Sequence, residues 1–81
     1  MQREAVRGLF VKAFSEVMPP TESDFGDEMT LAYLGMSSMD VMEVEMVMGE
    51  LSELQFPEDA MAGVVTVGDV LDVVESLGAG E

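Results

Sequence analysis

Apolar residues recur at helical spacing in the first stretch of the chain, which runs roughly from Gln2 to Met18. Intervals of three, one and three residues separate the apolar positions, and this spacing places them on one face of an amphipathic helix. The positions are Val6, Leu9, Phe10, Ala13, Phe14 and Val17. Because Pro19 and Pro20 follow directly, we expect the helix to end there.

The stretch from about Ser38 to Glu53 predicts a second helix. A serine is a favoured N-cap, and no glycine or proline interrupts the stretch before Gly49. Two neighbouring apolar stripes make its apolar surface unusually wide. The first stripe consists of Met39, Met42 and Met46, and the second of Val41, Val44, Met48 and Leu51. Because methionine at helical spacing is more often core filler than a ligand contact, we expect Met42, Met46 and Met48 to pack in the core.

The acidic residues of this second helix gather on its outward side. At helical spacing Asp40, Glu43 and Glu50 share one face, and Glu45 and Glu53 lie at its margins. We therefore expect the helix to present a negatively charged surface to solvent.

A third helix is predicted near the end of the sequence. Thr66 is its expected cap, Asp69 lies at the third position, where an acid favours a helix N-terminus, and Gly78 is expected to stop it. Its apolar positions are Val67, Val70, Leu71, Val74 and Leu77. The short segment from Glu58 to Gly63 is expected to form one or two helical turns.

The connection from Pro19 to Ser37 is long for a compact domain, and connections of this length are usually functional or disordered. Four large apolar residues within it are expected to be buried anchors, which favours a functional loop. They are Phe25, Leu31, Tyr33 and Leu34. No stretch alternates with the period of a strand. We therefore predict an all-α fold with a single domain over residues 1–81: a small four-helix bundle with three main helices, one short helix and a long loop between the first two helices.

The composition narrows the possible functions. The chain has no cysteine and no histidine, so it lacks the thiolate, the commonest general base and the commonest metal ligand. We expect no metal site and no enzyme. The start lacks the pattern of a signal peptide, and no apolar run is long enough for a membrane span. The expected compartment is the cytoplasm, with no membrane partner.

The formal net charge is −14, and Arg3, Arg7 and Lys12 are the only cations. Such a charge favours basic protein surfaces as partners and disfavours nucleic-acid binding. A solvated acidic shell that keeps the protein soluble is an equally good interpretation of the charge alone.

The sequence LGMSSMD places Ser37 and Ser38 where the long loop becomes the second helix. One interpretation is that either serine only caps the helix, which contributes about 1 kcal/mol. An activated nucleophile is excluded because it needs a neighbouring base, and the only lysine lies in the first helix. A modification site is the third interpretation, since a serine at such a corner is exposed and the nearby acidic face would attract a basic modifying enzyme.

Three spaced motifs resemble those of acyl carrier proteins. The segment LGMSSMDVMEVEMVMGELSE resembles the family's Leu-Gly pair, Asp-Ser-Leu triplet and acidic helix. The segment FPED resembles the Ile-Pro-Asp that opens the family's second long loop, and VVTVGDVLDVV resembles the start of its last helix. The resemblance covers about residues 30 to 77.

The resemblance implies a site at Ser38, because Leu34 and Gly35 precede it by four and three residues, as the family's Leu-Gly pair precedes its modified serine. A phosphopantetheinyl transferase would attach 4′-phosphopantetheine from coenzyme A to this hydroxyl. Acyl or polyketide intermediates would then be carried as thioesters. The implied further partners are ketosynthases, acyltransferases or other synthase enzymes with basic docking surfaces, and we expect a monomer.

The resemblance also implies a set of partner-recognition residues around this site. They are Ser37, Met39, Asp40, Glu43 and Glu50. Ser37 departs from the family, which usually has Asp at this position. The departure implies a transferase of broader specificity, or inefficient modification.

The pathway remains open between several alternatives. The triplet is more like those of fatty-acid and polyketide carriers than those of peptidyl carriers, and the missing Asp favours specialised metabolite biosynthesis. A housekeeping fatty-acid carrier, a peptidyl or aminoacyl carrier and a degenerate carrier are alternatives, and an acidic mimic of nucleic acid is the alternative outside the family. The family also stows short acyl chains beside its second helix, which gives the methionines a second possible role.

Overall fold

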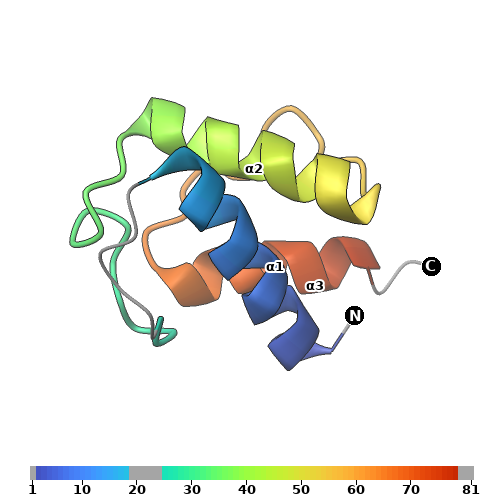
Figure 1. The fold of residues 1–81 in the computed structure, drawn as a ribbon, viewed down its shortest axis with the longest axis horizontal. Coiled ribbons are helices and arrows are strands. Elements are labelled where there is room, and N and C mark those ends of the chain that lie inside the picture. The colour runs from blue at the N-terminus through green and yellow to red at the C-terminus, as the bar shows by residue number, and fades with distance from the viewer. Residues whose placement is uncertain (1, 19–24, 79–81) are drawn as a thin grey trace.

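The computed structural model describes residues 2–18 and 25–78, and this part of the chain forms three helices (Figure 1). They are α1 (Arg3–Val17), α2 (Ser38–Ser52) and α3 (Val67–Gly78). The all-α prediction is confirmed, and the predicted bounds of the first two helices agree with the observed ones within one residue. None of the helices in the described ranges is both long and apolar enough to cross a membrane.

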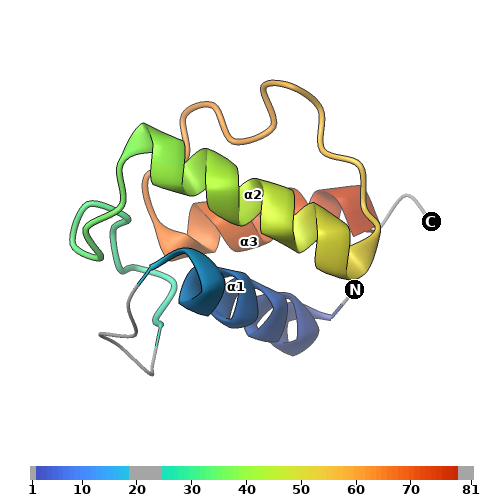
Figure 2. The same cartoon turned by 45° about the horizontal axis from the view of Figure 1, so that its top comes forward.

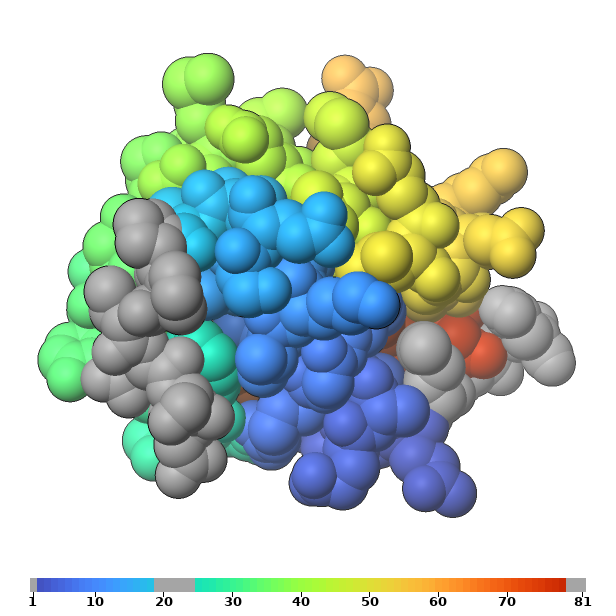
Figure 3. Space-filling model, viewed as in Figure 1, coloured from blue at the N-terminus to red at the C-terminus, as the bar shows by residue number. Residues whose placement is uncertain are grey.

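Helix α1 packs against both of the other helices, whereas α2 and α3 do not pack closely on each other (Figure 2). In the space-filling view α1 covers the front of the molecule, and the upper edge of α2 stays open (Figure 3). In Figure 2 the segment that connects α2 to α3 arches above both helices. This arrangement decides which sides of α2 are buried.

The centre of the core is a cluster of three phenylalanines. Phe10 and Phe14 come from α1, and Phe25 comes from the long loop; their ring centroids lie 5.0 to 6.0 Å apart, with Phe25 edge-on to both. The remaining buried apolar residues surround this cluster. They are Val6, Ala13, Leu31, Leu34, Val44, Met48, Val67, Val70, Leu71 and Val74.

Three of the four predicted loop anchors are buried, namely Phe25, Leu31 and Leu34. The prediction for Tyr33 is wrong, since 69% of this residue is exposed. Residues 31–35 form a turn in which Leu31 and Leu34 take the inner positions, so Tyr33 falls on the outer side. Residues 19–24 of the predicted loop lie outside the described part of the chain.

Backbone pairing holds the loop against the start of α3. Thr30 and Thr66 form an isolated antiparallel bridge, and Leu31 N–H donates to the Val65 carbonyl at 2.9 Å. Gly68 N–H donates to the Asp27 carbonyl at 2.9 Å, and a Cβ at Gly68 would lie only 3.0 Å from that oxygen. The close approach therefore requires a glycine in the first turn of α3.

The predicted short helix is wrong. Residues 58–63 form consecutive turns, in which each hydrogen bond joins residues three positions apart. Ala60 N–H donates to the Pro57 carbonyl and Ala62 N–H donates to the Asp59 carbonyl, both at 3.0 Å. Gly63 then adopts φ 83°, which ends any helical path. So short a segment gains too few hydrogen bonds to offset helix nucleation. The described residues thus form three helices instead of four.

The methionine prediction for α2 is correct only for Met48. Met48 is fully buried, whereas Met42 and Met46 are 63% and 65% exposed. At about 100° per residue, Met42 and Met46 lie roughly 160° around the helix from buried Val44. Because the core covers one side of α2, these two side chains remain in solvent.

Two of the three cations form ion pairs inside the fold. Arg3 pairs with Asp27 at 2.7 Å and with Asp72 at 2.8 Å, and it also pairs with Glu75. Arg7 pairs with Asp27 at 2.5 Å and donates to the Phe25 carbonyl. The cluster joins α1, the loop and α3, and hydrogen bonds from the two arginines lower the pKa of the Asp27 carboxyl.

We predict that Asp27→Asn lowers the melting temperature at neutral pH. A lowered carboxyl pKa contributes stability above the ordinary pKa, and this contribution is lost as the pH falls through the lowered value. The difference between variant and wild type should therefore shrink on acidification, as thermal denaturation followed by circular dichroism between pH 7 and pH 2 would measure. Glu28→Gln, an exposed neighbour with the same loss of charge, is the control. An equal effect of both substitutions would contradict the prediction.

Candidate functional site

The corner that leads into α2 is held by Leu34 and Gly35. Leu34 is buried in the core, and Gly35 adopts φ 79°, a left-handed conformation that favours glycine. Met36 N–H donates to the Leu31 carbonyl at 3.0 Å and closes the turn. The Leu-Gly pair thereby fixes where the chain enters the helix.

Ser37 is the N-cap of α2. Its hydroxyl accepts a hydrogen bond from Asp40 N–H at 3.2 Å, and the Asp40 carboxylate accepts one from Ser37 N–H at 2.9 Å. This reciprocal pair is a capping box. Of the two serines, Ser37 therefore performs the capping role, and the Asp40 carboxylate also takes part in it.

Ser38 is the first residue of α2 and is exposed. Its hydroxyl makes no hydrogen bond with the residues that the structure describes. The N-terminus of a helix favours a negatively charged phosphate through its free N–H groups and its dipole. The free hydroxyl and the position of Ser38 thus fit a phosphate ester at this residue.

An exposed methionine ridge, formed by Met39, Met42 and Met46, runs along α2 from this corner. Met39 is 71% exposed, and the ridge lies on the side of the helix opposite the core. Glu43 and Glu50 are also exposed and share one face beside the ridge. The helix therefore presents a combined apolar and acidic surface, which the sequence interpretation missed for Met42 and Met46.

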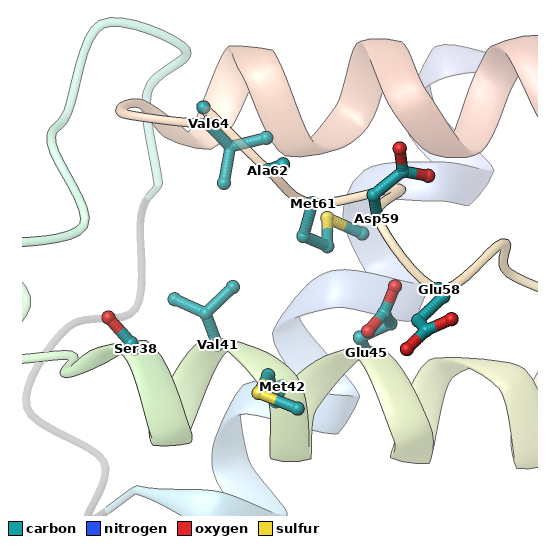
Figure 4. Close-up of a pocket in the computed structure, with 10 residues that line it drawn as sticks. Ser38, Val41, Met42, Glu45, Glu58, Asp59, Met61, Ala62 and Val64 are labelled. Atoms are coloured by element: carbon teal, nitrogen blue, oxygen red, sulfur yellow. The ribbon is translucent and has the colours of Figure 1, made fainter.

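A cavity of about 470 Å³ lies between α2 and the 58–64 segment (Figure 4). Ser38, Val41 and Glu45, spaced by three and four residues, line it from one face of α2. The other lining residues are Met42, Glu58, Asp59, Met61, Ala62, Gly63 and Val64. The cavity begins beside the candidate attachment residue and is bordered by both apolar and acidic side chains.

Glu45 occupies an unexpected position in this cavity. The sequence places it at the margin of the outward acidic face, but the residue is half-buried, and its carboxylate points toward the 58–64 segment (Figure 4). The Oε2 atom is buried and has no hydrogen-bond partner among the described residues. Burial raises the pKa of the Glu45 carboxyl, because removal from water disfavours the charged form.

No family model matches the sequence. The acyl carrier protein of Prochlorococcus marinus (strain MIT 9515) is 35% identical over 43 residues, a match that covers 53% of this chain and 54% of the relative. The chain thus matches about half the length of this curated relative.

A solved structure matches over nearly the whole chain. It is a chain in the crystal structure of the curacin biosynthetic pathway HMG synthase in complex with acetyl donor-ACP, with a TM-score of 0.80 and 26% identity. The match covers 94% of this chain and 99% of that chain. The resemblance to acyl carrier proteins is therefore confirmed by both comparisons, and the structural match extends to the first helix, where the sequence motifs were weak.

We predict that Ser37→Ala destabilises the protein by about 1 kcal/mol, because it removes the acceptor for Asp40 N–H. In a domain of this size such a loss lowers the melting temperature by roughly 5 °C. Urea denaturation would measure the free energy. Ser38→Ala is the matched control and should change the stability by less than about 0.5 kcal/mol. Equal losses from the two substitutions would show that Ser37 is not the residue that caps α2.

Proposed function

We propose that this chain is an acyl carrier protein that carries acyl or polyketide intermediates as thioesters on a 4′-phosphopantetheine arm attached to Ser38. The observation that carries the proposal is the exposed, unengaged Ser38 hydroxyl at the start of α2, in a chain that resembles acyl carrier proteins in sequence and fold. When attached, the group supplies a thiol that the chain itself lacks.

The surrounding residues prepare Ser38 for this role. Buried Leu34 and left-handed Gly35 hold the corner in place, and the capping box between Ser37 and Asp40 satisfies the helix end without using the Ser38 hydroxyl. The hydroxyl oxygen is thus free to form a new P–O bond to the pantetheine-bearing phosphorus of coenzyme A. The hydroxyl proton is lost, the pyrophosphate P–O bond breaks, and 3′,5′-adenosine bisphosphate leaves. The helix N-terminus then stabilises the phosphate charge.

The methionine ridge and the neighbouring acids of α2 are the proposed docking surface. Glu43 and Glu50 would meet basic side chains on a phosphopantetheinyl transferase or a synthase enzyme, while the ridge supplies apolar contact. Flexible methionines can adapt to several partners in turn. Because Ser37 brings no carboxylate to the corner, a transferase of broad specificity is the proposed modifying enzyme.

Specialised metabolite biosynthesis is the proposed setting. The structural neighbour is a chain from a complex of the curacin pathway, in which an HMG synthase is bound to its acetyl donor-ACP. A housekeeping fatty-acid carrier is the alternative, because the curated relative is named as an acyl carrier protein without a pathway. We propose that the chain acts as a monomer that visits its partners in succession.

We predict that incubation with coenzyme A and a promiscuous phosphopantetheinyl transferase raises the intact mass by one phosphopantetheine. Ser38→Ala should abolish the gain because the acceptor oxygen is removed, whereas Ser37→Ala should retain it. Intact-protein mass spectrometry measures both results. A gain that disappears only in Ser37→Ala would transfer the attachment to that residue, and no gain in the wild type would reject the carrier function.

We predict that Glu43→Lys or Glu50→Lys slows transferase modification on the order of tenfold at low salt, because the substitution repels a basic docking surface. The deficit should shrink at high salt, where charges are screened. Initial rates at several salt concentrations measure both effects. Glu4→Lys changes the net charge equally at the start of α1, away from α2 in Figure 1, and is the control. An equal deficit in the control would show that total charge alone sets the rate.

A further inference from the structure

The buried, unpartnered oxygen of Glu45 is the feature that the proposed function does not use. Nearly all buried polar groups in proteins have a hydrogen-bond partner, and each exception calls for an explanation. The Oε2 atom is buried, yet the carboxyl as a whole faces a cavity that is large enough for a small ligand. A ligand in this cavity could therefore supply the missing partner.

The position of Glu45 relative to Ser38 suggests what the ligand is. Glu45 is the seventh residue after Ser38 in α2, so it lies about 10 Å further along the helix axis. Val41 lies between them on the same face, and Met61 and Val64 line the opposite wall (Figure 4). A chain that enters the cavity from the Ser38 end therefore passes apolar side chains before it reaches a carboxylate.

An entirely apolar acyl chain fits poorly in a cavity whose apolar walls lead to the Glu45 carboxylate. It would displace water from the cavity and leave the Glu45 carboxylate with still less solvation. No basic residue lines the cavity within the described part of the chain, and the nearby Glu58 and Asp59 are also acids, which cannot donate when ionised. A group with its own hydrogen-bond donor satisfies Glu45 without any change in the protein.

We propose that the cavity selects an acyl cargo with a hydrogen-bond donor, a hydroxyl or an amine, which donates to Oε2 of Glu45. This inference rests on the proposed attachment at Ser38, and it adds a specificity-determining residue. The donor chemistry could also come from the amide and hydroxyl groups of the phosphopantetheine arm. The experiment must therefore separate the cargo from the arm.

The test uses four forms of the protein made with a promiscuous transferase: the form with the bare arm, and forms loaded from butyryl-, 3-hydroxybutyryl- and 3-aminobutyryl-coenzyme A. Intact mass verifies the loading first, so a failure of the proposed function appears as an absent mass gain. Melting temperatures and the pKa of the Glu45 carboxyl, followed by carbon-13 NMR, are then compared between the forms.

For the wild type, we expect at least one of the hydroxyl and amine forms to melt about 4 °C or more above the butyryl form, which corresponds to one good hydrogen bond in a domain of this size. The same form should show a lower Glu45 pKa than the butyryl form. Comparison of the two donor-bearing forms then identifies which donor the cavity prefers.

In Glu45→Val the order should reverse, with the butyryl form the most stable, because the carboxylate is replaced by an apolar wall. Glu16→Val, the same substitution at an exposed position of α1, is the matched control and should keep the wild-type order. If Glu45→Val fails to fold, the melting and NMR comparisons of the wild-type forms still decide the question.

Two results would overturn the inference. The first is loaded wild-type protein whose melting temperature and Glu45 pKa are the same for all three cargoes. The second is a bare-arm form in which the Glu45 pKa has already fallen as far as in the hydroxyl and amine forms, since the arm would then supply the donor.

Discussion

The packing of both α2 and α3 on α1 is the constraint on which the rest of the structure depends. Phe10 and Phe14 of α1 form the centre of the core, and Phe25 extends it to the long loop. Because α2 and α3 do not pack closely on each other, the connecting segment has to cover the space between them. The cavity beside Ser38 is a consequence of this arrangement, since the turns of residues 58–64 cover the space without filling it.

The same constraint gives α2 three distinct sides. Val44 and Met48 face the core, Val41 and Glu45 face the cavity, and the methionine ridge faces solvent, with Met42 of the ridge also bordering the cavity. Each side has a different chemical task in the proposed carrier: stability, contact with cargo and contact with enzymes. The two serines at the start of α2 also have different roles. The Ser37 hydroxyl accepts the hydrogen bond from Asp40 N–H, which leaves the Ser38 hydroxyl free.

Local signals explain what could be predicted from the sequence. Helix bounds follow from apolar spacing and from a serine N-cap before α2. They also follow from the Thr66 and Asp69 cap, which the structure contains with hydrogen bonds of 3.1 Å in both directions. The predictions that failed concern positions whose burial depends on neighbours from other parts of the chain. The sequence of α2 alone does not indicate which of its two apolar stripes the core covers. Glu45 lines a cavity only because the 58–64 segment passes opposite it.

The exposure of the methionine ridge has a chemical consequence. Thioether sulfur is readily oxidised to the sulfoxide, which is polar and chiral, and accessible side chains react first. Met39, Met42 and Met46 are open to oxidants, whereas Met48 is shielded by the core. Oxidative stress would therefore convert the apolar strip of α2 to a polar one while the fold stays intact, and methionine sulfoxide reductases could restore it.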